Sequence, residues 1–213
     1  MKKIISITVL FTAIAVIATS CGSPKHEKTI QNLRSAIDGE SKAHATYLAF
    51  SRQAAKEGFF NIAAMFSAAA EAEAIHVRNH NDVLVLLGKD PYYPTVGEIG
   101  VLSTMENLLA AIAGETFEFE EMYPKFIAQA YEENSIEAAR SFEWAKGAEM
   151  THAKFKTMIV RILQTTGSDA TVPPTWFVCS SCGDLYYEID DMLRCPLDNT
   201  ETSSFFRFEH ERQ

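Results

Sequence analysis

Apolar residues recur every three to four positions over four long stretches of the chain, which is the pattern of amphipathic helices. In the first stretch, Leu33, Ile37, Tyr47 and Phe50 trace one helical face, and the acidic Glu40 falls on that same face. The predicted helices span residues 29–56, 61–87, 103–132 and 135–166. Together they predict a mainly α protein with a four-helix bundle over residues 29–166.

A change of composition after the fourth helix predicts a second, smaller domain. Residues 167–174 contain glycine, serine and a pair of prolines, which is typical of a linker. Beyond Trp176 the chain alternates like a strand and carries a Cys-x-x-Cys-Gly motif at Cys179 and Cys182. A domain of about forty residues is too small to hold a core without a metal. We therefore expect residues 175–213 to form a metal-binding domain.

Carboxylates at core positions of the third helix predict a metal site in the bundle. Glu115 and Glu118 are three residues apart, so both project from one helical face. Leu108 and Met122 follow the same period, which makes this face the buried one. Because an isolated buried carboxylate is costly, two of them require compensation, most simply by a metal cation.

The other predicted helices supply further ligands. Glu40 is a single carboxylate, whereas Glu73 with His76 and Glu149 with His152 form two Glu-x-x-His pairs. Residues three apart lie about one turn apart, so one helix offers an oxygen and a nitrogen to the same metal. Carboxylates and imidazoles both suit iron. Two such pairs and single glutamates from two further helices are the arrangement of di-iron carboxylate bundles.

The spacing of these residues indicates an internal duplication. Glu73 and Glu149 are 76 residues apart, as are His76 and His152. Glu40 lies 75 residues before Glu115. A duplicated helix pair predicts a bundle with two-fold pseudo-symmetry, which naturally builds a two-metal site.

These motifs resemble the rubrerythrin family. The match rests on Gly-Glu-x-x-Glu followed by Met-Tyr-Pro, on both Glu-x-x-His pairs and on Cys-x-x-Cys-Gly, and it covers about residues 30–213. The resemblance implies a ferritin-like bundle followed by a rubredoxin-like domain. It also implies a di-iron peroxidase that reduces hydrogen peroxide to water in protection against oxidative stress. Electrons would come from an external donor or reductase through a C-terminal iron, and the protein would be a homodimer.

The resemblance also assigns roles to individual residues. It gives an oxo-bridged pair of iron ions seven ligands, which are Glu40, Glu73, His76, Glu115, Glu118, Glu149 and His152. On reduction, one iron would exchange Glu118 for His76. Tyr47 and Tyr123 match tyrosines that hydrogen-bond ligand carboxylates, and ordinary core packing is their alternative. His44 and His80 each follow a proposed ligand by four residues, and we expect them at the surface or behind the ligands.

The small domain departs from the family at one ligand. A rubredoxin site has a second Cys-Pro-x-Cys, whereas this chain reads Cys195-Pro-Leu-Asp198. We expect Cys179, Cys182, Cys195 and Asp198 to hold one mononuclear iron, because a carboxylate can bind ferric iron. Zinc or an empty site is the alternative. A further alternative in an exported protein is a Cys179–Cys182 disulfide with Cys195 free.

The first residues predict export. Lys2 and Lys3 precede an apolar run over residues 4–18, which is too short for a membrane span and fits a signal peptide. Small residues before the lone Cys21 resemble a bacterial lipoprotein signal, with plain secretion or an uncleaved anchor as alternatives. We therefore expect a signal peptide over residues 1–20, lipidation of Cys21 and a tether over residues 21–28. The protein would then be an exported lipoprotein that touches a membrane through its lipid alone.

Charge and motifs narrow the function classes. A net charge of −9 without a basic stripe argues against nucleic acid as a partner. The chain has no glycine-rich dinucleotide fingerprint, so reduced nicotinamide would act through a separate reductase. Two other functions stay open, namely ferritin-type oxidation and sequestration of iron, and a non-catalytic lipid-anchored bundle. Glu118 and the cysteine domain favour the peroxidase.

Overall fold

The computed structural model describes residues 26–209, so the predicted signal peptide and the lipidation site Cys21 lie outside the described residues. The long helices are α1 (Glu27–Lys56), α2 (Phe60–Leu86), α3 (Thr104–Phe117), α4 (Tyr123–Glu132) and α5 (Ile136–Thr166). A π-helical segment, η1 (Glu118–Met122), joins α3 to α4. The predicted four-helix bundle with a small C-terminal domain is confirmed.

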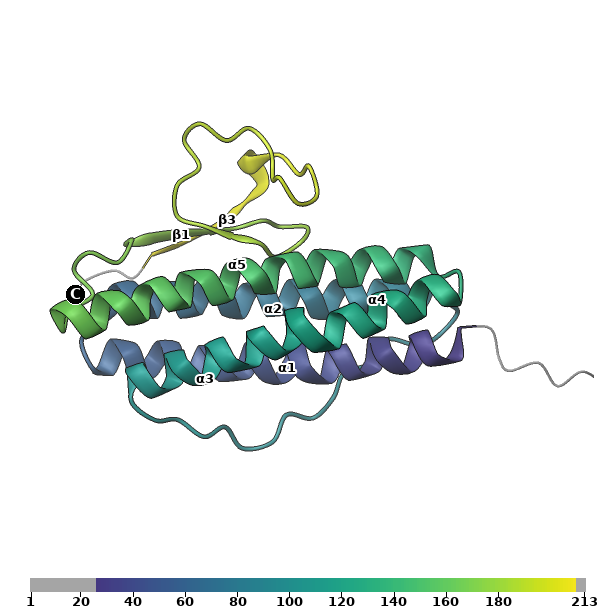
Figure 1. Ribbon diagram of the computed structural model, residues 1–213, viewed down its shortest axis with the longest axis horizontal. Coiled ribbons are helices and arrows are strands. Elements are labelled where there is room, and N and C mark those ends of the chain that lie inside the picture. Colours follow the sequence, from purple (N-terminus) through teal and green to yellow (C-terminus); the bar gives the residue numbers. More distant parts are fainter. Residues whose placement is uncertain (1–25, 210–213) are drawn as a thin grey trace, which may run out of the picture.

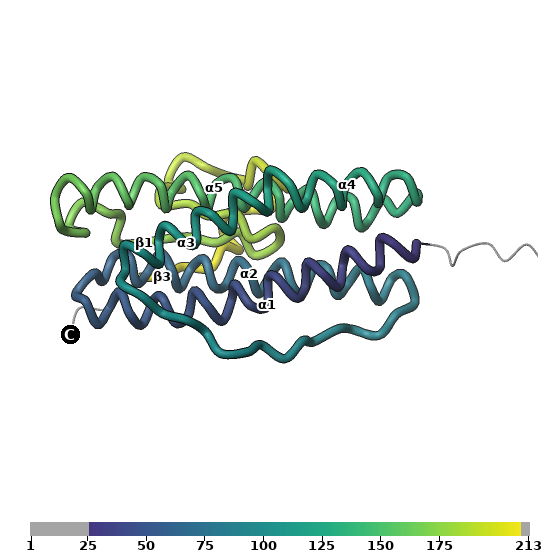
Figure 2. Tube along the Cα trace, turned by 60° about the horizontal axis from the view of Figure 1, so that its bottom comes forward, coloured from purple at the N-terminus to yellow at the C-terminus, as the bar shows by residue number. Residues whose placement is uncertain are grey.

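The helices lie side by side in two antiparallel pairs, α1 with α2 and the α3–η1–α4 rod with α5 (Figure 1). The connection between α2 and α3 runs along the length of the bundle, as both views show (Figures 1 and 2). This long path is necessary because α2 ends at one end of the bundle and α3 begins at the other. Each pair therefore contributes two helices to one interior.

The interior consists of two apolar clusters with polar residues between them. Along α1, Leu33 belongs to one cluster and Phe50 to the other, with buried Glu40 between them. The same order recurs in α5, where Phe142 and Ile159 flank the buried Glu149. Burying one such large side chain stabilises the fold by about 1.5–3 kcal/mol, so the clusters offset the cost of the polar layer.

Three helices begin at a carboxylate from a distant part of the chain. The first N–H groups of a helix have no partner within it, and the positive end of its dipole favours a negative charge. The pairs are Glu133 with Thr29 of α1, Asp169 with Asn61 of α2, and Glu57 with Thr104 of α3. The predicted linker is thus tied to the bundle through Asp169 and through the buried Val172.

The small domain lies on the bundle over α2 and α5 (Figure 1). Its antiparallel sheet has the order β2-β1-β3, with a 3₁₀ turn η2 before the last strand. The elements are β1 (Thr175–Val178), β2 (Leu185–Tyr186), η2 (Thr202–Ser204) and β3 (Phe206–Glu209). Buried Trp176 of β1 packs edge-on against Phe155 of α5, with 5.4 Å between ring centres. The domain is therefore docked on the bundle by apolar contact.

One predicted boundary differs from the fold. The predicted tether reaches residue 28, whereas α1 already begins at Glu27, because Glu133 accepts the N–H groups of Lys28 and Thr29. Pro124 lies in the first turn of α4, directly after η1. Among residues 26–209, no helix is long and apolar enough to cross a membrane.

Candidate metal centres

Two groups of buried acids and histidines meet in the polar layer of the bundle. Within each group, one ligand atom per residue lies within 4.8 Å of all the others. The first group is Glu40, Glu73, His76 and Glu149, and the second is Glu73, Glu115, Glu149 and His152. Because Glu73 and Glu149 belong to both, the arrangement offers two adjacent metal positions with two shared carboxylates.

The carboxylates in these groups have oxygens that lack partners. Three buried oxygens have no hydrogen-bond partner, namely Oε2 of Glu40, Oε1 of Glu73 and Oε2 of Glu115. Buried polar atoms in proteins are nearly always satisfied, so three such oxygens in one place indicate a ligand. Carboxylate oxygens combined with imidazole nitrogens are a donor set that suits iron. The residues present therefore fit a pair of metal cations.

Both histidines direct one nitrogen into the cluster and the other toward the small domain. His76 Nδ1 lies 3.0 Å from a Glu149 oxygen, and its Nε2 lies 3.0 Å from the carbonyl oxygen of Cys182. His152 Nδ1 lies 3.2 Å from Glu149, and its Nε2 lies 3.1 Å from the carbonyl oxygen of Gly183. Since a carbonyl only accepts, Nε2 donates in each ring, which leaves the Nδ1 lone pair for a metal.

A tyrosine hydroxyl fixes each of the single glutamates. Tyr123 donates to Oε1 of Glu40, and Tyr47 donates to Oε1 of Glu115 at 2.9 Å. In each case, the other carboxylate oxygen is the one that lacks a partner. Both tyrosines are buried, so these contacts lie in a dry interior. The sequence reasoning missed one neighbour of this arrangement, the fully buried Lys156, which forms an ion pair with Glu115.

The π-helical segment accounts for the unequal spacing in the two halves. Tyr47 follows Glu40 by seven residues, whereas Tyr123 follows Glu115 by eight. Seven residues make about two α-helical turns, so an eighth would rotate the tyrosine away from the cluster. The wider π turn takes up the extra residue between Glu115 and Tyr123. The change of offset from 75 to 76 was the sequence signal for this insertion.

Glu118 lies at the edge of the cluster and belongs to neither four-residue group. It lines a cavity of about 400 Å³ between α1 and α3, whose wall runs from the exposed Lys42 to the buried Tyr47. Burial, together with the neighbouring carboxylates of Glu40 and Glu149, raises the pKa of Glu118 well above its usual value. Glu118 thus faces both the cavity and the cluster.

The crowding of acids shifts the pKa values in the cluster. Burial and the nearby Glu149 and Glu40 raise the pKa of Glu73 well above its usual value. Burial also acts on Glu149, yet the charge on His152 and the hydrogen bond from it hold the pKa of Glu149 well below the usual range. For His76, hydrogen bonds to the glutamates outweigh burial and raise the pKa. Without a metal, the cluster therefore retains protons.

His44 and His80 lie outside the two groups of possible metal ligands in the bundle. His44 Nδ1 is 2.7 Å from the carbonyl oxygen of Ala70 on α2. His80 bonds through Nδ1 to the hydroxyl of Ser141 at 2.7 Å and through Nε2 to that of Tyr123 at 3.2 Å. Burial lowers the pKa of His80 to about 3, so its ring is uncharged at neutral pH. Neither histidine belongs to the groups of possible metal ligands among the described residues.

The small domain brings together a second candidate site. One ligand atom each of Cys179, Cys182, Cys195 and Asp198 lies within 4.8 Å of the others. The three thiols are free, and the 3.6 Å between the sulfurs of Cys182 and Cys195 is far longer than a disulfide bond. Hydrogen bonds from the other two thiols hold the pKa of Cys195 well below its usual value. Asp198 completes the Cys₃Asp set, 3.6 Å from the sulfur of Cys179.

The two candidate sites are in direct contact through Gly183, which the sequence reasoning did not anticipate. Gly183 has φ +80°, and a Cβ there would lie 2.6 Å from His76 Nε2 and 3.1 Å from the carbonyl oxygen of Ala72. Only a residue without a side chain lets the backbone approach so closely. The glycine after the second cysteine was the available signal.

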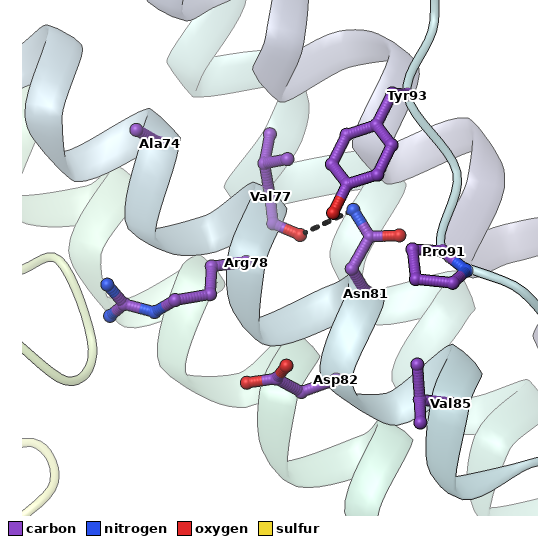
Figure 3. Close-up of a pocket in the computed structure, with 8 residues that line it drawn as sticks. All are labelled: Ala74, Val77, Arg78, Asn81, Asp82, Val85, Pro91 and Tyr93. Carbon is purple, nitrogen blue, oxygen red and sulfur yellow. Dashed lines mark hydrogen bonds between the residues drawn. The ribbon is translucent and has the colours of Figure 1, made fainter.

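A further cavity of about 240 Å³ is separate from both sites. It lies between α2 and the long α2–α3 connection, where Arg78 and Tyr93 form parts of its wall (Figure 3). The amide of Asn81 donates to the carbonyl of Val77 at 3.2 Å beside it (Figure 3). No residue of either metal-ligand group lines this cavity.

Comparison with known proteins identifies relatives that cover most of the chain. The family model for rubrerythrin matches residues 31–159. Nigerythrin from Nitratidesulfovibrio vulgaris is 34% identical over 188 residues, which cover 88% of this chain and 87% of that protein. Rubrerythrin from the same organism is 32% identical, covering 82% of this chain and 91% of that protein. A structure of nigerythrin in a mixed-valence state has a TM-score of 0.76 at 32% identity, covering 91% of this chain and 90% of the other.

The comparisons contradict the predicted signal peptide, the lipidation of Cys21 and the export of the protein. The relatives that cover most of this chain are rubrerythrins and a nigerythrin, and none of their names indicates a lipoprotein or an exported protein. The prediction rested on a short apolar run before Cys21. Such a run is a pattern of composition that many sequences share, whereas metal ligands at fixed helical spacings are specific.

A more distant likeness shows the fold alone. The structure of bacterioferritin from Mycobacterium tuberculosis has a TM-score of 0.61 at 20% identity and covers 65% of this chain. The bundle is therefore ferritin-like, and the small domain corresponds to the rubredoxin-like domain of nigerythrin. With its carboxylate–histidine cluster, its cysteine site and its relatives in agreement, the chain belongs to the rubrerythrin family, a family of di-iron proteins.

Proposed function

We propose that this protein is a di-iron peroxidase that reduces hydrogen peroxide to water. The two metal positions would be held by Glu40, Glu73, His76, Glu115, Glu118, Glu149 and His152. Each peroxide molecule takes up two electrons and two protons and yields two molecules of water. When bound, the iron pair supplies these electrons and polarises the substrate.

The observation that carries the proposal is the direct link between the two candidate sites. His76 and His152 each donate from Nε2 to a backbone carbonyl beside the cysteine site, at 3.0 and 3.1 Å. The same rings present Nδ1 to the carboxylate cluster. A mononuclear iron held by Cys179, Cys182, Cys195 and Asp198 would thus lie one peptide group and one imidazole away from the pair. This short path supports electron delivery from an external donor through the small domain.

The cavity beside Glu118 supports access for a small substrate. It leads from the exposed Lys42 to the buried Tyr47 and to the partly buried Glu118, at the edge of the cluster. Burial and the neighbouring carboxylates raise the pKa of Glu118, so the site favours a partner that offsets its negative charge where peroxide would arrive. His76 lies inside the cluster and Glu118 at its edge, which supports their predicted exchange as ligands of one metal.

The test is anaerobic and separates the two half-reactions. Iron-loaded protein is reduced, mixed with one equivalent of peroxide and followed by absorption, for the parent and for Cys179→Ser. The proposal predicts rapid oxidation of the pair by peroxide in both proteins, because the cluster is intact in both. It predicts that the parent alone is quickly reduced again by an electron donor, since the variant lacks a thiol ligand of the cysteine site.

Ser180→Ala is the matched control, because it changes the neighbouring residue and keeps all three thiols. A slow response to peroxide, with faster oxidation by dioxygen and uptake of iron beyond the two sites, would instead establish a ferritin-type function. Equal re-reduction of the parent and Cys179→Ser would exclude the cysteine site as the path of the electrons.

A further inference from the structure

Lys156 is a fully buried cation beside the candidate iron pair. It lies in α5, four residues after His152, with 0% of its side chain exposed. Its ammonium group forms an ion pair with Oε1 of Glu115 and lies 4.6 Å from the ring centre of Tyr47. Burying a charge costs several kcal/mol before any pairing, so a lysine here is a specific feature of the site.

Lys156 determines which oxygen of Glu115 remains available. Both Lys156 and the hydroxyl of Tyr47 donate to Oε1, whereas Oε2 is buried without a partner. With two donors on Oε1, the carboxylate has one free oxygen for a metal. Glu115 is therefore prepared for binding through Oε2 alone.

The pseudo-symmetric position holds a different residue. His80 lies 76 residues before Lys156, the same offset that relates His76 to His152. His80 contacts the hydroxyl of Tyr123, which donates to Glu40, just as Lys156 contacts Tyr47 and Glu115. One half of the bundle thus places an uncharged ring behind its tyrosine, and the other half places a cation there. At this pair of equivalent positions, the two halves therefore differ by one unit of charge.

We propose that Lys156 is a positioning residue that makes the two metal positions electrostatically unequal. It confines Glu115 to one free oxygen and places a fixed positive charge beside the position that Glu115 and His152 serve. A nearby cation repels a metal ion and disfavours its higher oxidation state. Lys156 therefore weakens metal binding at that position and raises the reduction potential of the pair. This inference rests on the proposed di-iron function.

The experiment compares Lys156→Gln, Lys156→Met and Lys156→Arg with the parent. Each apoprotein is titrated anaerobically with Fe²⁺, and each loaded protein undergoes a redox titration followed by absorption. Loss of the charge in the Gln and Met variants should tighten the weaker binding step about tenfold or more. Loss of the charge should also lower the reduction potential. Lys156→Arg keeps the charge, so its Fe²⁺ affinity and its reduction potential should lie close to those of the parent.

Lys154→Met is the matched control, because it removes an exposed lysine two positions earlier on the same helix. Unchanged binding and potential in Lys156→Gln would overturn the inference, and so would an equal shift in Lys154→Met. If Lys156→Met fails to fold, the comparison of Lys156→Gln with Lys156→Arg still tests the effect of the charge, since both side chains keep a hydrogen-bond donor. A parent that binds no pair of Fe²⁺ ions would overturn the proposed function itself, which is a distinguishable result.

Discussion

At the scale of single residues, the two metal-facing histidines each have two functions. His76 and His152 present Nδ1 to the carboxylates, while Nε2 of each ring donates to a carbonyl of the small domain. The second contact fixes the tautomer and orientation of the ring, which is how outer partners tune a metal ligand. Docking of the small domain therefore helps to orient the two histidines of the carboxylate–histidine cluster, and Gly183 permits the close approach.

Gly183→Ala should destabilise the protein more than Gly58→Ala. Both glycines have positive φ, at +80° for Gly183 and +86° for Gly58, so backbone strain from an alanine destabilises the fold by about 1–2 kcal/mol at either position. At Gly183 the new Cβ would also collide with His76, whereas at Gly58 it meets no atom within 4 Å. Such overpacking adds about 1–3 kcal/mol. Urea denaturation of the two variants measures the difference, and equal losses would show that Gly183 is free to move.

At the scale of elements, the first turns of α1 and α3 are stabilised by carboxylates from other parts of the chain, Glu133 and Glu57. Partial burial raises the pKa of Glu133, but hydrogen bonds from Thr29 and Lys28 outweigh it and keep the pKa below its usual value. Glu57 shows the same balance with Thr104. Folded-state pKa values below the unfolded ones mean that this stabilisation is present above the usual carboxyl range. It is lost as the pH falls through the folded values.

Glu133→Ala should therefore reduce the free energy of unfolding by about 1 kcal/mol at pH 7, the typical effect of losing a helix cap. The difference from the parent should shrink at acidic pH, where the carboxyl of the parent is protonated. Urea midpoints at several pH values measure this trend. Glu132→Ala is the control, because it removes an exposed neighbouring carboxylate. A loss in Glu133→Ala that does not change with pH would contradict the capping role.

The π-helical segment makes a second prediction about elements. Deleting Phe119 from η1 should leave Tyr123 on the cluster face, since seven residues would then separate Glu115 from Tyr123, as in the first half. Deleting the buried Ala145 from the uninterrupted α5 should rotate everything after it by about 100°, including His152. Circular dichroism and thermal unfolding should show a folded first variant and a strongly destabilised second one. An equal loss of stability in the two deletion variants would contradict the idea that η1 accommodates one inserted residue.

At the scale of the whole molecule, the cluster makes stability depend on metal and on pH together. Burial raises the pKa of Glu73, Glu115 and Glu118 in the folded protein, and the hydrogen bonds to glutamates raise that of His76 against burial. Raised folded-state values contribute stability that is fully present below the unfolded pKa values. That stability is lost as the pH rises through the folded values.

Metal-free protein should therefore lose stability as the pH rises from the usual carboxyl range toward neutrality. Iron-loaded protein should not, because bound cations replace the protons and stabilise the native state by mass action. Urea midpoints of both forms between pH 5 and pH 8 measure the divergence. Parallel pH profiles for the two forms would show that the carboxylates do not bind the metal.

The sequence by itself determined where the helices lie, that the second helix pair repeats the first, and which acids and histidines share a helical face. Helical spacing fixes which side chains share a face, so Glu73 with His76 and Glu149 with His152 could be paired from their spacing alone. The Cys₃Asp set was predicted from its resemblance to a rubredoxin site, with Asp198 in the place of the fourth cysteine. A pattern of composition, by contrast, misled at the N-terminus, where the predicted lipoprotein was wrong.

The tertiary structure decided how the halves act on one another. Which oxygen of Glu115 is free, which nitrogen of His76 faces the cluster and how closely Gly183 approaches depend on neighbours far along the chain. Lys156 could not be anticipated, since a lysine on a helix is nearly always exposed. Spacing along a helix is a local property that the sequence contains, whereas burial and charge at a site arise only when the helices pack together.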